Sequence, residues 1–157
     1  MTVAAITDIF VFFSLIQNIM ELLCGYFKLQ NKSTSAWIAN TGDGGEIVPY
    51  KGTDYDDQYW RVVSRDGDFF KLQNKKSGKW IAHTHGGGDR IVAFNDADYE
   101  DQYWKVVPHD DGKHFKLENK KSCEWIANTH AGGDRIVPYK GATYPDQYWS
   151  ATCHKDL

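Results

Sequence analysis

Two loops of nearly identical sequence hold residues whose types and spacing could bind a ligand. Residues 84–90 read Thr-His-Gly-Gly-Gly-Asp-Arg and residues 129–135 read Thr-His-Ala-Gly-Gly-Asp-Arg, while residues 41–46 read Thr-Gly-Asp-Gly-Gly-Glu. Adjacent glycines let a ligand approach the backbone closely, and a neighbouring carboxylate accepts hydrogen bonds from hydroxyl groups. A tight turn followed by a solvated Asp–Arg pair explains the same residues equally well, so the loops alone leave both interpretations open.

Each loop is followed by two aromatic positions that lie five residues apart. The first position holds Tyr50, Phe94 and Tyr139, and the second holds Tyr55, Tyr99 and Tyr144. We expect the first position to face the glycine loop, because a ring beside carboxylates suits a sugar. The apolar face of a pyranose stacks on the ring while polar groups bind its hydroxyls. We expect the second position mainly to cover the edge of the core.

The loops recur because the chain consists of three similar units. Unit 1 covers residues 26–68, unit 2 residues 69–113 and unit 3 residues 114–157, and a period of about 44 residues is typical of repeat architectures. Tryptophans mark two registers, one at Trp37, Trp80 and Trp125 and the other at Trp60, Trp104 and Trp149. Each candidate site is therefore expected three times.

Each unit reads as four short strands joined by turns. In unit 2 the segments 70–73, 79–82, 90–94 and 103–107 alternate apolar and polar residues or are rich in β-branched residues, and helical periodicity is absent. A four-stranded unit of this size cannot bury its own apolar face, so three units must share one core. Because a propeller would need more blades, we predict an all-β fold, a β-trefoil with pseudo-threefold symmetry.

A family resemblance rests on one motif that occurs in all three units. Asp-Gln-Tyr-Trp stands at residues 57–60, 101–104 and 146–149, and a Lys-Ser-Gly-Lys-Trp turn and strand precedes it at residues 76–80. On these residues the chain resembles the ricin B-type (QxW) β-trefoil lectins throughout residues 26–157, and it is similar to the trefoil lectin domain of fungal hemolytic, pore-forming lectins. The resemblance implies a multivalent carbohydrate-binding agglutinin. Its partners would be galactose- or N-acetylgalactosamine-type glycans on glycoproteins or glycolipids.

The resemblance also implies which residues bind the sugar. The ricin B-type site combines an Asp on the second strand, an aromatic residue after the third and a polar residue just before the Gln of the motif. The aromatic residue falls on the first aromatic position, and the polar residue falls on Asp57, Asp101 and Asp146. The second-strand Asp is absent, since Ala39, Ala82 and Ala127 stand there, and the adjacent Asn40, His83 and Asn128 could substitute.

Together with the loops, these positions make up the expected sugar-binding set. Its members are Asn40, Gly44, Gly45, Tyr50, Asp57, His83, His85, Gly87, Gly88, Asp89, Phe94, Asp101, Asn128, His130, Gly132, Gly133, Asp134, Tyr139 and Asp146. The motif's own residues Gln58, Gln102, Gln147, Trp60, Trp104 and Trp149 are interpreted as structural. Each Trp should fill the shared core, and each Gln should bind backbone groups of the neighbouring hairpin.

Other kinds of site find little support in the sequence. His83 and His85 alternate along an extended chain, but no cysteine or carboxylate cluster of zinc-site spacing accompanies them. We therefore expect no metal and no cofactor. Nucleophile-elbow, phosphate-loop and Cys–His signatures are missing, so we do not expect an enzyme. With 18 basic and 21 acidic residues, a basic nucleic-acid face is not expected either.

Residues 1–25 lie outside the repeat and contain no Lys or Arg. Apolar residues recur there at helical spacing, which predicts an amphipathic helix that docks on the trefoil or on a second copy of the chain. A secretory signal peptide is the alternative. The uncharged run at residues 9–20 is too short to span a bilayer. A cytoplasmic and a secreted protein are both compatible with the sequence.

Three cysteines are too few for a disulfide scaffold, but Cys24 and Cys153 flank strands that would meet where a trefoil closes, so a disulfide between them is compatible with the fold. Asn31-Lys32-Ser33 is a glycosylation sequon.

Three functions compete on these grounds. The leading hypothesis is a multivalent lectin. The second is a protein-binding trefoil, such as a protease inhibitor, although such functions use one distinctive loop whereas the loops here agree. The third is the glycan-recognition part of a membrane-damaging protein, in which residues 1–25 act on lipid.

Overall fold

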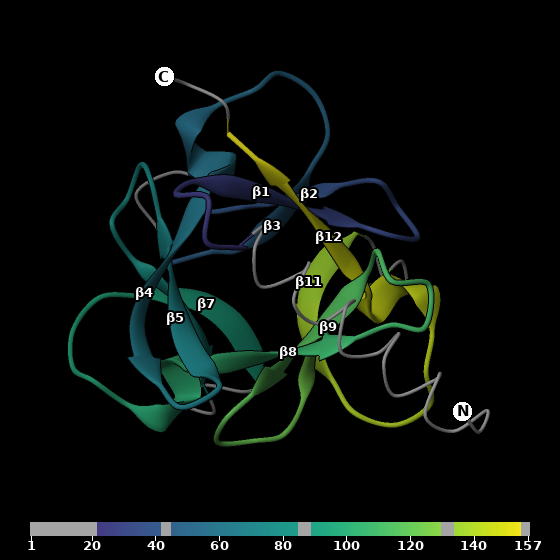
Figure 1. Cartoon of the computed structure of the whole chain (residues 1–157). Coiled ribbons are helices and arrows are strands. Elements are labelled where there is room, and N and C mark those ends of the chain that lie inside the picture. Colours follow the sequence, from purple (N-terminus) through teal and green to yellow (C-terminus); the bar gives the residue numbers. More distant parts are fainter. Residues whose placement is uncertain (1–21, 42–44, 85–88, 130–133, 155–157) are drawn as a thin grey trace, which may run out of the picture.

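The computed structural model of the chain describes residues 22–41, 45–84, 89–129 and 134–154. Its elements are short strands and single-turn 3₁₀ helices (Figure 1). In chain order they are β1 (Phe27–Asn31), β2 (Trp37–Ala39), β3 (Val48–Tyr50), η1 (Asp56–Gln58), β4 (Trp60–Asp66), β5 (Phe69–Asn74), β6 (Trp80–Thr84), β7 (Arg90–Phe94), η2 (Glu100–Gln102), β8 (Trp104–Pro108), β9 (Phe115–Asn119), β10 (Trp125–Thr129), β11 (Arg135–Tyr139), η3 (Pro145–Gln147) and β12 (Trp149–Cys153).

Half of the strands close a barrel. Strand β12 pairs with β1, β1 with β4, β4 with β5, β5 with β8, β8 with β9, and β9 returns to β12, all antiparallel. Within each unit the first and last strands meet at a single aromatic pair: Phe27 with Trp60, Phe70 with Trp104, and Phe115 with Trp149. Closure leaves this ring of strands without an exposed edge.

The remaining strands form three hairpins, β2–β3, β6–β7 and β10–β11, one in each unit. Figure 1 shows the three units arranged around a common centre. The first hairpin joins the second through a bridge between Glu46 and Val92 and a 2.7 Å hydrogen bond from the Ala93 N–H to the Gly45 carbonyl. A barrel with one hairpin per unit is a β-trefoil, so the fold predicted from the repeat is confirmed.

The tryptophans of the Asp-Gln-Tyr-Trp motif fill the shared core, as predicted. Trp60, Trp104 and Trp149 are at most 1% exposed. The indole N–H of Trp104 donates to the carbonyl of Ile81 at 2.9 Å, and the other two tryptophans make the same bond in their own units. Burial of three indoles with satisfied N–H groups anchors every hairpin to the barrel.

The glutamines of the motif have a different partner from the one predicted. The side-chain amide of Gln58 donates to the Thr53 carbonyl at 2.8 Å, and Gln102 and Gln147 donate to Ala97 and Ala142. Each Gln therefore closes the connection between the third and fourth strands of its own unit, not the neighbouring hairpin. That connection carries the second aromatic position.

An asparagine at the end of each unit's first strand links neighbouring units. The side-chain amide of Asn74 donates to the Asp57 carbonyl at 2.8 Å, while its oxygen accepts the backbone N–H groups of Lys76 and Ser77. Asn119 and Asn31 repeat this arrangement. The sequon asparagine, Asn31, is only 2% exposed and so has a structural role in the folded chain.

The amphipathic helix expected over residues 1–25 lies outside the described residues as far as residue 21, and no α-helix is among the described elements. Leu22 packs in the hydrophobic core, and a disulfide joins Cys24 to Cys153. The disulfide that the sequence left open thus ties the segment before β1 to β12. In the described part of the chain, no helix is long and apolar enough to cross a membrane.

Candidate functional site

The described residues that flank the glycine loops lie at the opposite end of each hairpin from the first aromatic position. In unit 2, Thr84 pairs with Arg90 beside the loop, whereas Trp80 pairs with Phe94 at the far end. Five residues of strand span roughly 13 Å at about 3.3 Å per residue. The expectation that the two features face each other is therefore wrong. Antiparallel register places Phe94, the last residue of its strand, at the end of the hairpin farthest from the Thr84–Arg90 pair.

The candidate residues consequently separate into two groups. One group surrounds the aromatic positions, and the other lies near the glycine loops. Of the loop group, Gly45, Asp89 and Asp134 are described, whereas Gly44, His85, Gly87, Gly88, His130, Gly132 and Gly133 lie outside the described residues.

The exposure of the two aromatic positions is the reverse of the prediction. Tyr55, Tyr99 and Tyr144 are 51–54% exposed, whereas the first position is half-buried in every unit. The two rings contact each other edge-on or tilted, with centroids 6.1–6.2 Å apart. Each unit thus presents one open tyrosine ring supported by a second ring, and we call this pair the aromatic platform.

In each unit a lysine that the sequence analysis missed lies over the tryptophan next to the platform. The amines of Lys28, Lys71 and Lys116 lie 4.0, 4.3 and 3.6 Å from the ring centroids of Trp37, Trp80 and Trp125. The first position pairs across the hairpin with the same tryptophan. A cation over an indole face is attractive when water is largely excluded. The recurrence of Lys between Phe and Leu in all three first strands was the signal available in the sequence.

In units 1 and 2 a carboxylate completes this arrangement. Lys28 lies 2.9 Å from Asp54 and the Tyr59 hydroxyl donates to the same carboxylate at 2.7 Å; Lys71 lies 2.6 Å from Asp98. Hydrogen bonds from the lysine, and next from the tyrosine, hold the pKa of the Asp54 carboxyl below its usual value. Asp98 is shifted in the same direction, chiefly by Lys71. Both groups are therefore ionised hydrogen-bond acceptors beside an exposed ring.

Unit 3 lacks the carboxylate. The Lys116 amine instead donates to the Thr143 hydroxyl at 3.2 Å, and burial lowers the pKa of Lys116. The three platforms are equivalent in their rings but not in their charges.

Several polar residues expected to bind sugar are buried. Asn40, His83 and Asn128 are at most 1% exposed, and Asp57 is 8% exposed. The Asn40 amide donates to the Glu46 carbonyl at 2.8 Å, which fixes the hairpin of unit 1. Asp101 and Asp146 are half-buried in η2 and η3. Among the polar candidates, these two aspartates lie closest to solvent around the platforms.

The position of the missing second-strand aspartate is also buried. Ala39, Ala82 and Ala127 are at most 2% exposed and pair across their hairpins with Val48, Val92 and Val137. This part of the hairpin is apolar in every unit, so no described side chain replaces that carboxylate in place.

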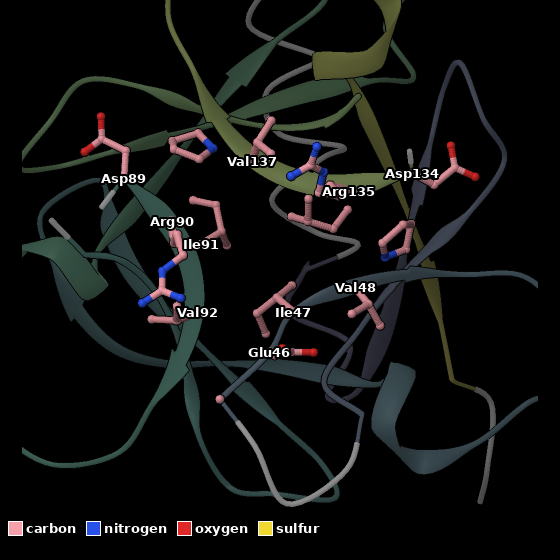
Figure 2. A pocket seen from close by; sticks show the side chains of 14 residues that line it. Glu46, Ile47, Val48, Asp89, Arg90, Ile91, Val92, Asp134, Arg135 and Val137 are labelled. Atoms are coloured by element: carbon pink, nitrogen blue, oxygen red, sulfur yellow. The ribbon is translucent and has the colours of Figure 1, made fainter. Parts of the chain in front are cut away.

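The described members of the loop group, Gly45, Asp89 and Asp134, border a cavity of about 550 Å³ where the three hairpins converge. Figure 2 shows its lining side chains arriving from β3, β7 and β11, with Asp89 and Asp134 at the rim. Equivalent residues of the three units line it, so the cavity lies on the pseudo-threefold axis. Arg90 and Arg135 stand where unit 1 has Glu46. No sequence pattern indicated this cavity, because it exists only between units.

Comparison with known proteins gives the same fold family as the strand arrangement described above. The family model described as "Ricin-type beta-trefoil lectin domain-like" matches residues 56–136, just over half of the chain. No curated protein is significantly similar to the sequence.

Solved structures share the fold at low sequence identity. The designed threefold-symmetric protein ThreeFoil is 22% identical with a TM-score of 0.74, and the match covers 83% of this chain and 99% of that one. SeviL, solved with the asialo-GM1 saccharide, is 19% identical with a TM-score of 0.66, covering 82% and 96%. A Polyporus squamosus lectin bound to the epitope Neu5Acα2-6Galβ1-4GlcNAc is 14% identical with a TM-score of 0.70, covering 81% and 48%.

Proposed function

Because the chain belongs to the ricin-type β-trefoil lectin domain-like family, we propose that it is a multivalent lectin that binds glycans at its three aromatic platforms and performs no catalysis. The observation that carries the proposal is the threefold recurrence of an open tyrosine ring, Tyr55, Tyr99 or Tyr144, on a supporting ring. A side chain as apolar as tyrosine is left half in water in all three units, although each unit has a core in which to bury it.

The chemistry of each platform suits a pyranose. The ring face offers apolar area to the C–H face of the sugar, and neighbouring charged groups offer hydrogen bonds to its hydroxyls. In units 1 and 2 the acceptors are the ionised Asp54 and Asp98, held in place by their lysines. The half-buried Asp101 and Asp146 are further acceptors at the base of the connection.

Galactose- and N-acetylgalactosamine-type glycans are the proposed sugar class. The family resemblance supports that class, and the Polyporus lectin's epitope contains galactose. The apolar Ala39, Ala82 and Ala127 remove the carboxylate that ricin B-type sites use, so recognition would depend more heavily on stacking and on the Lys–Asp pairs.

Three shallow sites on one rigid barrel favour avidity. Each site alone is expected to bind a monosaccharide weakly, whereas two or three sites engaged on one glycosylated surface convert the later binding steps into intramolecular ones. Overall binding to a surface can then exceed single-site affinity by about 10²–10⁴-fold.

A glycan array with free-sugar competition tests the proposal. The triple variant Tyr55→Ala, Tyr99→Ala, Tyr144→Ala should lose array binding while keeping its melting temperature, because these rings are exposed. The matched control, Tyr→Phe at the same three positions, retains the ring faces and should retain binding. If the alanine variant binds the array like the native chain, the platforms are not the sugar sites.

A further inference from the structure

One of the three inter-unit junctions contains a histidine where the other two contain asparagine. His83 occupies the position of Asn40 and Asn128, near the end of its unit's second strand. Its side chain is fully buried, and its Nδ1 lies 2.7 Å from the Ser122 hydroxyl oxygen, 39 residues further along the chain. The ring is thus held in one orientation by the neighbouring unit.

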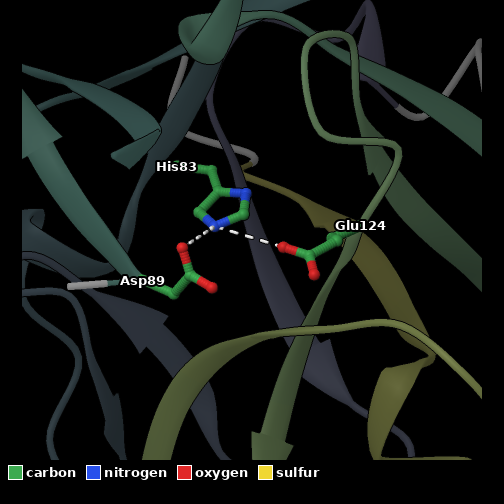
Figure 3. A group of neighbouring side chains, drawn as sticks. All are labelled: His83, Asp89 and Glu124. Atoms are coloured by element: carbon green, nitrogen blue, oxygen red, sulfur yellow. Dashed lines mark ion pairs between the residues drawn. The ribbon is translucent and has the colours of Figure 1, made fainter. Parts of the chain in front are cut away.

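Two carboxylates approach the other ring nitrogen. His83 Nε2 lies 3.3 Å from Glu124 Oε2 and 3.8 Å from Asp89 Oδ1 (Figure 3). His83 lies in β6, Asp89 directly precedes β7, and Glu124 directly precedes β10. Two units therefore supply the three residues. Figure 3 shows all three side chains pointing toward one point.

The Oε2 oxygen of Glu124 is shielded from solvent and accepts no hydrogen bond from the described residues. A buried carboxylate oxygen without a donor is costly unless a positive charge lies next to it. A second carboxylate, that of the exposed Asp89, lies at the same point.

From this arrangement we propose that His83, Glu124 and Asp89 bind a divalent transition-metal cation of the Zn²⁺ type. The three ligand atoms lie within 4.8 Å of one another. A tetrahedral Zn²⁺ with bonds of about 2.0–2.2 Å holds its ligands about 3.3–3.6 Å apart, and the exposed Asp89 side chain can close the remaining gap. One imidazole nitrogen and two carboxylate oxygens leave the fourth position to water.

The surroundings match what a metal-binding histidine requires. Contact of Nδ1 with Ser122 lets that nitrogen keep its proton, so that the Nε2 lone pair faces the carboxylates and is available to a metal. The two carboxylates neutralise a divalent charge. The cation would join unit 2 to unit 3 and fix Asp89 at the rim of the axial cavity.

The set of ligands occurs once. At the position of Glu124, unit 1 has Ala36 and unit 2 has Lys79. Among the residues that the structure describes, neither of the other two junctions has such a group of His, Asp and Glu side chains; the Thr34 hydroxyl, for example, donates to Asn128 at 2.6 Å. Asparagine therefore suffices for the structural role of this position. The metal-binding role that we propose needs the histidine and the glutamate, which occur together only at this junction in the sequence.

Zn²⁺ titration of the chelator-treated full chain tests this proposal. Calorimetry should give one tight Zn²⁺ equivalent, and the melting temperature should rise with Zn²⁺ concentration because the cation binds the folded chain. His83→Asn restores the residue of the other two units and so should fold. It should weaken Zn²⁺ binding at least tenfold, and so should Glu124→Gln.

His109→Asn removes a surface histidine away from the cluster and should leave the Zn²⁺ affinity unchanged. The proposal is overturned if the native chain binds no Zn²⁺ at millimolar concentration, which would mean that a proton on Nε2 is the occupant. It is equally overturned if His83→Asn binds Zn²⁺ like the native chain, which would place the metal elsewhere.

Discussion

The amine of Lys116 lies 3.6 Å from the centre of the Trp125 ring, in a site where the two equivalent lysines also pair with an aspartate. Thr143 stands in the place of that aspartate and provides only a hydroxyl. Unit 3 therefore keeps a largely buried ammonium group that faces an indole ring and a hydroxyl but has no ion pair among the described residues.

Thr143→Asp should stabilise the chain at neutral pH, because it supplies the carboxylate found in units 1 and 2. Position 143 is exposed, so the new ion pair should contribute no more than about 1 kcal/mol. Burial lowers the folded-state pKa of Lys116 below the unfolded value of about 10.4. At a pH between the folded-state and unfolded-state pKa values, Lys116 is protonated more fully in the unfolded chain than in the folded chain. The free energy of unfolding therefore rises with pH through this range. The carboxylate should reduce that rise, as measured by urea unfolding at pH 7 and pH 9.5.

Thr143→Asn is the matched control, since it has a similar shape and no charge. Equal stabilisation by the asparagine variant would show that the negative charge is not the cause.

Loss of the Cys24–Cys153 disulfide should strongly destabilise the chain. The bond closes a loop of 129 residues, for which the chain-entropy model gives up to about 5 kcal/mol. Cys153→Ser, or reduction of the native chain, should lower the urea midpoint accordingly. Cys123→Gly is the control and should leave the urea midpoint close to that of the native chain. Cys123 is a free, exposed thiol, and its positive φ matches that of Gly78 at the equivalent position. A native chain whose midpoint is unaffected by reductant would contradict the prediction.

Replacement of Asn31 by alanine should cost about 1–3 kcal/mol, because the partly buried Asp146 carbonyl and two backbone N–H groups lose their partner. Denaturant unfolding measures the loss. Ser33→Ala destroys the same sequon without touching the asparagine side chain and should be nearly neutral. Similar losses in both variants would argue against the structural role of the amide.

The two tryptophan registers should respond differently to phenylalanine. In Trp104→Phe the Ile81 carbonyl loses the buried indole N–H, which should cost about 1–3 kcal/mol. The indole N–H of Trp80 makes no hydrogen bond to the described residues, so Trp80→Phe retains a ring beneath Lys71 at a smaller cost. Thermal unfolding of the two variants compares them directly, and a larger loss for Trp80→Phe would contradict this assignment. Trp104→Ala should cost about 3–5 kcal/mol through the cavity it creates.

Local patterns in the chain were sufficient for the fold. The two-residue alternation of the strands, the turn residues between them and three copies in register identify twelve strands and one shared core, because such signals depend on near neighbours. Burial of Trp60 and its two counterparts followed from the same repeat.

Contacts between units were decided only by the closed barrel. Arg90 and Phe94 are close in the chain yet lie at opposite ends of a hairpin, whereas His83 and Glu124 are distant in the chain and 3.3 Å apart. Equivalence between repeats shows which positions correspond, but it contains no information on which side chains of different units meet. That depends on how the antiparallel strands pair and close around the axis, and on which side chains the closure removes from water.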